Sequence, residues 1–518
     1  LMASAGRDAN IIAGVIASSD QGGGATVVAG NNLNLGTVTT SSANQIVWDA
    51  KNRRSDGAST EVGSQIQSAG TVRLAAGNDL NARAANVEAA GAVFTSAGRD
   101  LNISAGQSSQ SVDEAHQHTS RGFLSSRTDT TLDQVKRTDR VGSSFSGSTV
   151  TALAGRDLAV SGSSVVSDTA TTLLAQNNIS IEAASNTSEE QHLVAQKKSG
   201  LLGSGGIGFT IGTREQSMDG KSQAIGHTAS TVGAINGDVT IIAGNQYQQK
   251  GSDLLAPGGD INVSAKNIAI TELQNTEAMQ AEQKFKQSGL SVALTSPVLS
   301  ALQTGQQTMQ AAGNTGNGRM QALAVANGAF ATRDVYNALQ AGQSSTGNNP
   351  SAATEHSAAD KAGGINVSIS AGGSKSQSNS SSSASSAQGS IIAAGGNVNL
   401  TASGAGLDSN LTVQGSDIRA GYNASLNADN AIALLAAQST ASQDSSNTSS
   451  SGSLGVSFGT NGFGVTASAS KGRGNADGSD VGWTNTHVAA GHQLSLNSGG
   501  DTTLKGAVAS SQQVIADV

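Results

Sequence analysis

The sequence has no cysteine and few large side chains: 3 Pro, 2 Trp, 3 Tyr and 8 Phe among 518 residues. Without cysteine the chain has no disulfide, no thiol nucleophile and no thiolate ligand for a metal. Charged residues make up only 13%, and the formal net charge of −8 gives no basic footprint for nucleic acid. No apolar run approaches the about 20 residues that a membrane-spanning helix needs. These absences exclude a nucleic-acid partner and argue against an ordinary globular enzyme.

Small residues dominate the composition instead. Glycine accounts for 65 residues, nearly twice its average usage. Such a chain lacks the side chains that fill a wide globular core, but Val, Ile, Leu and Ala fill a thin core inside a stacked coil of strands. Hydrophobic residues are 36% and alternate regularly, which argues against disorder.

A short unit recurs along the chain. It reads AGRDANIIA at 5–13, AGNDLNARA at 76–84, AGRDLNISA at 97–105 and AGRDLAVSG at 154–162, and looser copies begin at residues 29, 175, 257, 394, 420, 490 and 498. We interpret each copy as a turn and a short strand. Glycine takes positive φ without steric cost, and the following Asp or Asn bonds its own backbone. Apolar residues then recur at every second position, so stacked units bury a common face and form a solenoid.

Polar excursions interrupt the units. We place hairpins at about residues 44–67, 107–148, 185–232 and 438–489, within coiled stretches at 1–271 and 391–518. The units between excursions amount to about two coils of roughly 20 residues each. All excursions therefore leave from one edge of the coil, about 10 Å apart, where neighbouring hairpins are placed to pair.

The largest excursion, 272–390, is predicted to be a helical and low-complexity insert. Ser296 and Pro297 supply a cap and a first-turn proline, and apolar spacing predicts helices at about 297–312, 319–330 and 333–341. Residues 363–373 (GGINVSISAGG) are typical of a strand. The serine-rich tract 374–388 is either a mobile segment or the arm of a hairpin. The sequence thus predicts an all-β chain with one small α-helical insert.

Two glycine-rich tips are the candidate functional sites. Residues 200–213 (GLLGSGGIGFTIGT) and 452–470 (GSLGVSFGTNGFGVTASAS) alternate glycine with apolar residues. Apolar side chains that project from a polar rod are not explained by core packing. We hypothesise that a partner or membrane is contacted by five of them: Phe209, Ile211, Phe458, Phe463 and Val465. The alternative is that the hairpins pack on one another or on the rod.

Motifs for chemistry lack their structural context. The G-x-G-x-x-G at 203–208 precedes a strand pattern instead of a helix, and the G-x-S-x-G at 455–459 lies in strand-like alternation. His116 and His118 fall in a polar stretch typical of a solvated loop. The turn Asp residues recur too rarely for a calcium-binding roll and often follow Arg, so we expect Asp–Arg pairs. We predict no catalytic residue, no cofactor, no metal and no small-molecule substrate.

The units also carry a family resemblance, strengthened by five later blocks: GSGGIGFTIGTREQS at 203–217, AGGNVNLTA at 394–402, VQGSDIRAG at 413–421, ASASKGRGNADGSDVGWTNTHV at 467–488 and SGGDTTLKGAVAS at 498–510. Together they resemble the haemagglutinin repeats of filamentous haemagglutinins and contact-dependent growth-inhibition effectors, the exported proteins of two-partner secretion. The resemblance covers essentially the whole chain. It implies a right-handed parallel β-helix in a rod that is secreted or held on the surface of a Gram-negative cell, with the periplasm as a stage before delivery.

The expected function is therefore structural: a rod segment that presents or delivers a distal module to neighbouring cells. The implied partners are the outer-membrane transporter of two-partner secretion, read by a domain outside this sequence, and a target-cell receptor or outer membrane. A rod of a host-cell adhesin is the alternative. A β-helix enzyme that degrades polysaccharide is a further alternative, disfavoured because no cluster of Asp, Arg and Lys marks a catalytic groove.

Overall fold

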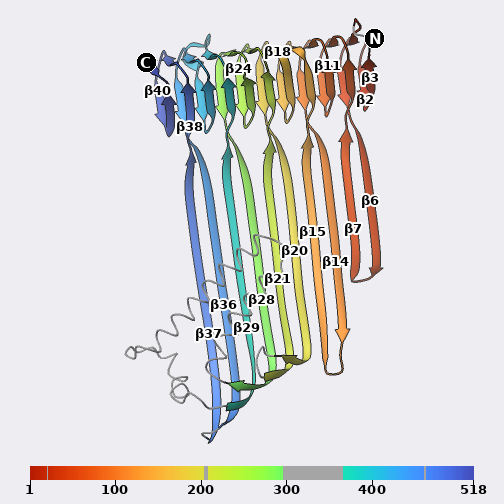
Figure 1. Ribbon diagram of the computed structural model, residues 1–518, viewed down its shortest axis with the longest axis vertical. Coiled ribbons are helices and arrows are strands. Elements are labelled where there is room, and N and C mark those ends of the chain that lie inside the picture. Colours follow the sequence, from red (N-terminus) through yellow and green to blue (C-terminus); the bar gives the residue numbers. More distant parts are fainter. Residues whose placement is uncertain (20–21, 204–207, 296–365, 460–461, 518) are drawn as a thin grey trace.

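The computed structural model describes residues 1–19, 22–203, 208–295, 366–459 and 462–517. Two bodies of strand are seen in Figure 1. Short strands stack as coils in a rod along the top, and long hairpins hang from one edge of the rod as a broad sheet. The one helical element in the described ranges is the 3-10 turn η1 (Gly406–Asp408).

Each coil of the rod contributes three short strands, and each strand pairs in parallel with its equivalent in the next coil. This arrangement is the right-handed parallel β-helix that the family resemblance implies. One face is an 11-stranded sheet: β2 (Ala9–Ile12), β5 (Leu33–Gly36), β10 (Leu80–Arg83), β13 (Leu101–Ser104), β17 (Leu158–Ser161), β19 (Asn178–Glu182), β24 (Gln246–Lys250), β27 (Asn267–Thr271), β32 (Leu411–Gln414), β35 (Ile432–Leu435) and β40 (Thr502–Lys505).

The other two faces join into one 21-stranded sheet, because β16 (Ser144–Ala154) and β18 (Ser164–Ala175) turn the corner and pair on both faces. The second face adds β3 (Val15–Ser18), β8 (Gln65–Ser68), β11 (Asn86–Ala89), β22 (Thr231–Ala234), β25 (Asp253–Ala256), β30 (Ile391–Ala394), β33 (Asp417–Ala420), β38 (Thr486–Ala490) and β41 (Ala507–Ser510). The third adds β1 (Met2–Ala5), β4 (Ala25–Ala29), β9 (Val72–Ala76), β12 (Val93–Ala97), β23 (Asp238–Ala243), β26 (Ile261–Ala265), β31 (Val398–Ala402), β34 (Asn423–Ala428), β39 (Gln493–Ser498) and β42 (Gln513–Asp517).

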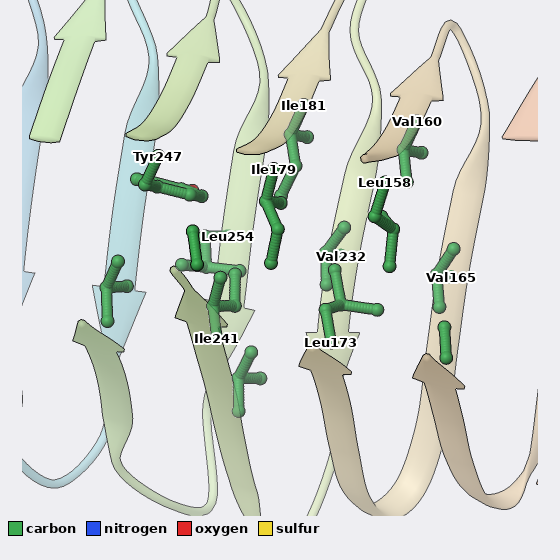
Figure 2. Packing of buried hydrophobic residues seen from close by; sticks show 14 of the residues in the cluster. Leu158, Val160, Val165, Leu173, Ile179, Ile181, Val232, Ile241, Tyr247 and Leu254 are labelled. Atoms are coloured by element: carbon green, nitrogen blue, oxygen red, sulfur yellow. The ribbon is translucent and has the colours of Figure 1, made fainter. Parts of the chain in front are cut away.

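Alternate residues of the rod strands point inward, as a period of two requires. Leu80 stacks on Leu33 of the preceding coil, and both are 0% exposed. Figure 2 shows the same stacking farther along, where Leu158, Ile179 and Tyr247 occupy one column. The core is thus a continuous thin column of aliphatic side chains, and burial of such surface at about 25 cal/mol per Å² is the main apolar stabilisation of the rod.

The repeat glycine serves close packing, and the prediction that it adopts positive φ is wrong. The glycine at the second position of the unit, as in Gly77, Gly98 and Gly155, is not among the residues with positive φ in the described ranges, which instead include the last residue of several units, such as Ala84 and Gly162. A Cβ at Gly77 would lie 2.1 Å from the carbonyl oxygen of Gly30, and one at Gly98 would lie 2.0 Å from that of Gly77. The turns of successive coils stack so closely that a side chain has no room.

The turn Asp bonds the next coil and not its own backbone, which also corrects the sequence prediction. Asp79 accepts hydrogen bonds from the backbone N–H of Asp100 (3.2 Å) and from Nε of Arg99 (2.8 Å), both one coil later. Arg156 bonds Asp100 in the same way. The predicted Asp–Arg pairing is therefore confirmed, and it acts between coils. The bonds from Arg99 hold the pKa of Asp79 below its usual range.

A column of buried hydroxyls lies where each coil re-enters the second face. Ser230 donates from Oγ to the carbonyl of Glu182 (2.6 Å) and accepts from the backbone N–H of Ser163 (3.2 Å). In the last such coil Thr486 donates to the carbonyl of Leu435 (2.6 Å). The column, at most 3% exposed throughout, consists of Ser64, Ser143, Ser163, Ser230, Ser252, Ser390, Ser416 and Thr486. Where a hairpin leaves the coil, the hydroxyl belongs to a residue just after the hairpin, and it bonds the carbonyl at the end of the rod strand just before the hairpin.

Five hairpins leave the rod after β5, β13, β19, β27 and β35, which are alternate strands of the 11-stranded sheet. They pair in the order β37-β36-β29-β28-β21-β20-β15-β14-β7-β6 and make one ten-stranded antiparallel sheet, here called the wing (Figure 1). The prediction that the excursions share one edge and pair is confirmed. The wing strands are β6 (Val38–Asp49), β7 (Asn52–Val62), β14 (Gly106–Arg121), β15 (Ser125–Val141), β20 (Ala184–Gly203), β21 (Gly208–Thr228), β28 (Leu273–Thr295), β29 (Asn366–Gln388), β36 (Ala437–Gly459) and β37 (Gly462–Thr484).

The segment 272–390, expected to be a helical and low-complexity insert, begins and ends in the wing. β28 and β29 pair over their whole lengths, and the serine-rich tract 374–388 is the returning arm of this fourth hairpin. Serine suits such an arm because both faces of the sheet meet solvent. The helices expected at 297–312, 319–330 and 333–341 lie outside the described residues.

Candidate functional site at the distal end of the wing

The wing strands carry apolar side chains at matching positions near their distal ends. Leu201 pairs with Ile211, Ile211 with Leu290, Leu290 with Ala371 and Ala371 with Leu454. Residues paired directly across antiparallel strands point to the same face. Ile211 is 53% exposed and Leu454 66% exposed. This register places a line of aliphatic side chains on one open face.

A second apolar line lies two residues farther out and therefore on the same face. Phe209 pairs with Val292, Val292 with Ile369, Ile369 with Val456 and Val456 with Val465. Phe209 is 40% exposed and Val465 is 69% exposed. Five strands from three hairpins thus contribute to a single surface.

The two aromatic residues predicted for the last hairpin complete this surface. Phe458 and Phe463 are paired across β36 and β37, and their ring centroids lie 5.2 Å apart with planes inclined by 55°. They contact each other and remain 48% and 66% exposed. The surface, here called the apolar patch, consists of Leu201, Phe209, Ile211, Leu290, Val292, Val367, Ile369, Leu454, Val456, Phe458, Phe463 and Val465.

The structure brings all five predicted residues to one patch and adds members that the sequence analysis missed. Leu290 was overlooked because it lies within 272–390, the segment expected to be a helical and low-complexity insert, and Leu454 because only the pairing register shows what it faces. The signal was the repeated motif Gly-Leu, which occurs at 200–201, 289–290 and, with one intervening serine, at 452–454.

A row of glycines separates the apolar patch from the wing arms. Gly200, Gly212, Gly289 and Gly372 are paired in succession across four strands. A Cβ at Gly212 would lie 2.0 Å from the carbonyl oxygen of Ser288, whereas a Cβ at Gly226, nearer the rod on the same strand, would meet nothing within 4 Å. The sheet bends at this row, and in Figure 1 the ends of β20, β21 and β28 turn away from the direction of their arms.

The remaining sequence motifs do not assemble a chemical site. Residues 204–207 of the G-x-G-x-x-G lie outside the described residues, and the G-x-S-x-G lies within β36. His116 is hydrogen-bonded to Glu114 (2.7 Å) and contacts the ring of Trp48, in the wing. No group of three His, Asp or Glu side chains suited to a metal occurs in the described part of the chain. No helix in that part is long and apolar enough to cross a membrane.

A rod of three-stranded coils with a lateral wing and an exposed distal patch defines a class: repeat-built parallel β-helix proteins. The Hemagglutinin repeat family matches residues 3–120, 124–289 and 369–518, and the chain belongs to that family.

Curated relatives share much of the chain. The Deoxyribonuclease CdiA of Yersinia pseudotuberculosis is 40% identical over 373 residues, which are 71% of this chain and 33% of that protein. A Toxin CdiA of Escherichia coli is 35% identical over 468 residues, 88% of this chain and 14% of that protein. The tRNA nuclease CdiA of Escherichia coli strain 536 is 34% identical over 410 residues, 77% of this chain and 12% of that protein. The chain thus spans a third or less of these relatives. No solved structure matches it.

Proposed function

We propose that this chain is a rod segment of a secreted surface protein of a Gram-negative bacterium, and that the rod delivers a distal toxic module to neighbouring cells on contact. The observation that carries the proposal is the uninterrupted stack of coils, whose interior is filled by its own side chains. Such a stack holds a distal module at a fixed distance along its axis, and its filled interior offers no room for a substrate. The relatives' names, which include a toxin and two nucleases, favour delivery over host-cell adhesion.

The segment itself has no enzymatic role in this proposal. In this proposal, the nuclease activities that the relatives are named for belong to parts of those proteins outside the region shared with this chain. Export requires an outer-membrane transporter of the two-partner type, and the rod meets a receptor or the outer membrane of the target cell. Before delivery the protein passes through the periplasm of the producing cell.

The apolar patch is the part of this segment that contacts the target cell. Its support is physical: exposed aromatic and aliphatic side chains from several hairpins converge on one charge-free surface, and such patches mark interaction sites. Phe209, Ile211, Phe458, Phe463 and Val465 are its proposed contact residues, of which Val465 is the most exposed at 69%.

The test uses the full-length parent protein in a co-culture of producing and target bacteria. Phe209, Phe458 and Phe463 are replaced together by Ser. Burial of one Phe contributes about 1.5–3 kcal/mol, so we expect killing of target cells to fall by at least about tenfold. The matched control replaces the rod-surface residues Ile242, Leu407 and Val508, which are 43%, 83% and 44% exposed, by Ser. Unchanged killing by a correctly displayed patch variant would remove the patch from the delivery function.

A further inference from the structure

Charge is sorted along the wing. A register row is a set of residues paired with one another across the wing strands. The five register rows next to the glycine row, on the side nearer the rod, hold ten basic residues and only two acids, Asp129 and Glu215. The whole chain, in contrast, carries a net charge of −8. The basic residues are Arg121, Arg127, Lys197, Lys198, Arg214, Lys284, Lys286, Lys375, Lys471 and Arg473. Acidic side chains such as Asp219, Glu282 and Asp444 lie nearer the rod. The apolar patch is therefore bordered by a basic belt.

Four lysines of the belt lie in one register row. Lys197 pairs with Glu215, Glu215 with Lys286 and Lys286 with Lys375, and Lys471 continues the row through Ser450. We call Lys197, Lys286, Lys375 and Lys471 the lysine row. Lys197, Lys286 and Lys375 each lie four residues along their strand from a position in the first apolar line, for example Lys286 from Leu290, and Lys471 lies four residues from Ala467, the partner of Leu454 in that line. An even separation places both on the same face.

Exposure along β28 agrees with this shared face. Lys284, Lys286, Ser288 and Leu290 are exposed, whereas the residues between them are partly covered. The alternation runs through Gly289 without a break. The patch and the lysine row are consequently parts of one open surface, about 14 Å apart along the strand.

The lysine row borders a hollow of about 470 Å³ whose lining includes Lys197, Lys284, Lys286 and Lys375 with a single carboxylate, Glu215. Lys197 Nζ lies 2.6 Å from Glu215, and this bond lowers the pKa of the Glu215 carboxyl. No described carboxylate forms an ion pair with Lys286 or Lys375. Thr128 and Gln117 also line the hollow, so lysines and uncharged polar residues surround it.

We propose that this surface docks the wing on an anionic lipid layer, with the apolar patch in the acyl boundary and the lysine row on the phosphates of the headgroups. An apolar surface beside a basic one is the arrangement that binds at a membrane interface, because long lysine side chains reach the headgroups while apolar groups leave water. The bend at the glycine row lets the patch lie along the surface while the arms rise from it. This inference rests on the proposed contact between patch and target cell, and it names phosphate as the recognised chemistry.

The test measures co-flotation of the 518-residue chain with vesicles of neutral phosphatidylcholine or of phosphatidylcholine with an anionic phosphatidylglycerol fraction. A lysine near an anionic surface changes the binding constant by about fivefold. Replacing Lys197, Lys286, Lys375 and Lys471 by Gln should therefore reduce binding to anionic vesicles by about 100-fold or more. Replacing all four by Arg should preserve binding, and raised salt should weaken it.

The control variant replaces Lys51, Lys136, Lys266 and Lys505 by Gln. It takes the net charge from −8 to −12, as the lysine-row variant does, and it should bind like the unmodified chain. Equal loss in both variants, equal binding to neutral and anionic vesicles, or full binding by the lysine-row variant would each overturn phosphate recognition.

Two further outcomes separate this inference from the proposed function. Saturation of the hollow by inorganic phosphate alone, without vesicle binding, would make it a free-phosphate site and overturn lipid docking. Vesicle binding that survives in the lysine-row variant but is lost in the Phe209, Phe458 and Phe463 variant would leave the membrane contact standing without its phosphate component. If the unmodified chain floats with neither vesicle, the membrane contact itself fails.

Discussion

Replacement of Ser230 by Ala tests how the coil closes across a hairpin. Ser230 is fully buried at the end of the third hairpin, where its hydroxyl donates to the carbonyl of Glu182 and accepts from the backbone N–H of Ser163. The carbonyl of Glu182 keeps a second donor, the backbone N–H of Gly162 (3.0 Å). The N–H of Ser163 has no other acceptor among the described hydrogen bonds. Alanine therefore leaves one buried donor without a partner and removes one good hydrogen bond.

The magnitude follows from these two losses. An unsatisfied buried donor costs about 1–3 kcal/mol, and a lost hydrogen bond about 0.5–1.5 kcal/mol. We expect a local destabilisation of about 2–4 kcal/mol, since the side chain barely changes in volume. The neighbouring hydroxyls, Ser163 and Ser252, keep their own bonds, so the effect is confined to the coils on either side.

Hydrogen exchange is the suitable assay, because a long array of coils does not unfold in one cooperative step. In the Ser230→Ala variant, amides of β17, β19 and β22 should exchange about 30-fold to several hundred-fold faster, as about 1.4 kcal/mol corresponds to a factor of ten. Ser479→Ala on the exposed wing strand β37 is the control and should change nothing. Unchanged exchange in the three rod strands, or a uniform increase along the whole rod, would refute the role of the hydroxyl in closing the coil.

Two other predictions address the contacts between coils. Gly77→Ala places a Cβ 2.1 Å from the carbonyl oxygen of Gly30, whereas Gly6→Ala, at the equivalent position of the first unit, meets nothing within 4 Å. Hydrogen exchange of the strands that flank each turn should show a local loss of about 1–3 kcal/mol for the first variant and less than about 0.5 kcal/mol for the second, and equal losses would contradict close packing of the turns. Asp79 has a pKa held below its unfolded value of about 3.9 by Arg99. Its ion pair therefore stabilises the rod above that pH and is lost as the pH falls through the lower, folded pKa. The unmodified chain should exceed Asp79→Asn in urea midpoint at pH 7 and match it at about pH 2; a gap that persists in acid would contradict the pairing.

The sequence alone predicts the parts of the fold that depend on periodicity. Alternating apolar residues such as Leu101 and Ile103 fix which side chains enter the rod, and the spacing of polar excursions fixes the common edge from which the hairpins leave. Both are local patterns of one chain segment. These two patterns can be recognised in the sequence because the core is thin and each unit repeats the same arrangement of apolar residues.

The rest depends on neighbours that are distant in sequence. Glycine is needed at position 77 because the carbonyl of Gly30, 47 residues earlier, leaves no room for a side chain. The hydrogen-bond partner of Asp79 comes from the next coil. The role of Ser230 appears only when Glu182 is found beside it. The apolar patch needs the pairing register of six strands, since Leu290 and Leu454 are unremarkable in their own segments. Register across hairpins follows from long-range pairing, which composition and local spacing do not encode.

The two-coil period of the hairpins has a geometric cause. Successive coils are stacked about 4.8 Å apart, and neighbouring strands of any sheet are also about 4.8 Å apart. A hairpin contributes two strands, so it occupies about 9.6 Å of the wing, which equals the rise of two coils. One hairpin per coil would crowd the wing, and one in every three coils would leave a strand-wide gap. The departures after β5, β13, β19, β27 and β35, each separated by one strand without a hairpin, match this requirement along the whole described rod. Removing or adding a single coil between two hairpins would therefore break the wing while leaving the rod intact. Because the apolar patch is built from six strands of the wing, the patch would be lost as well.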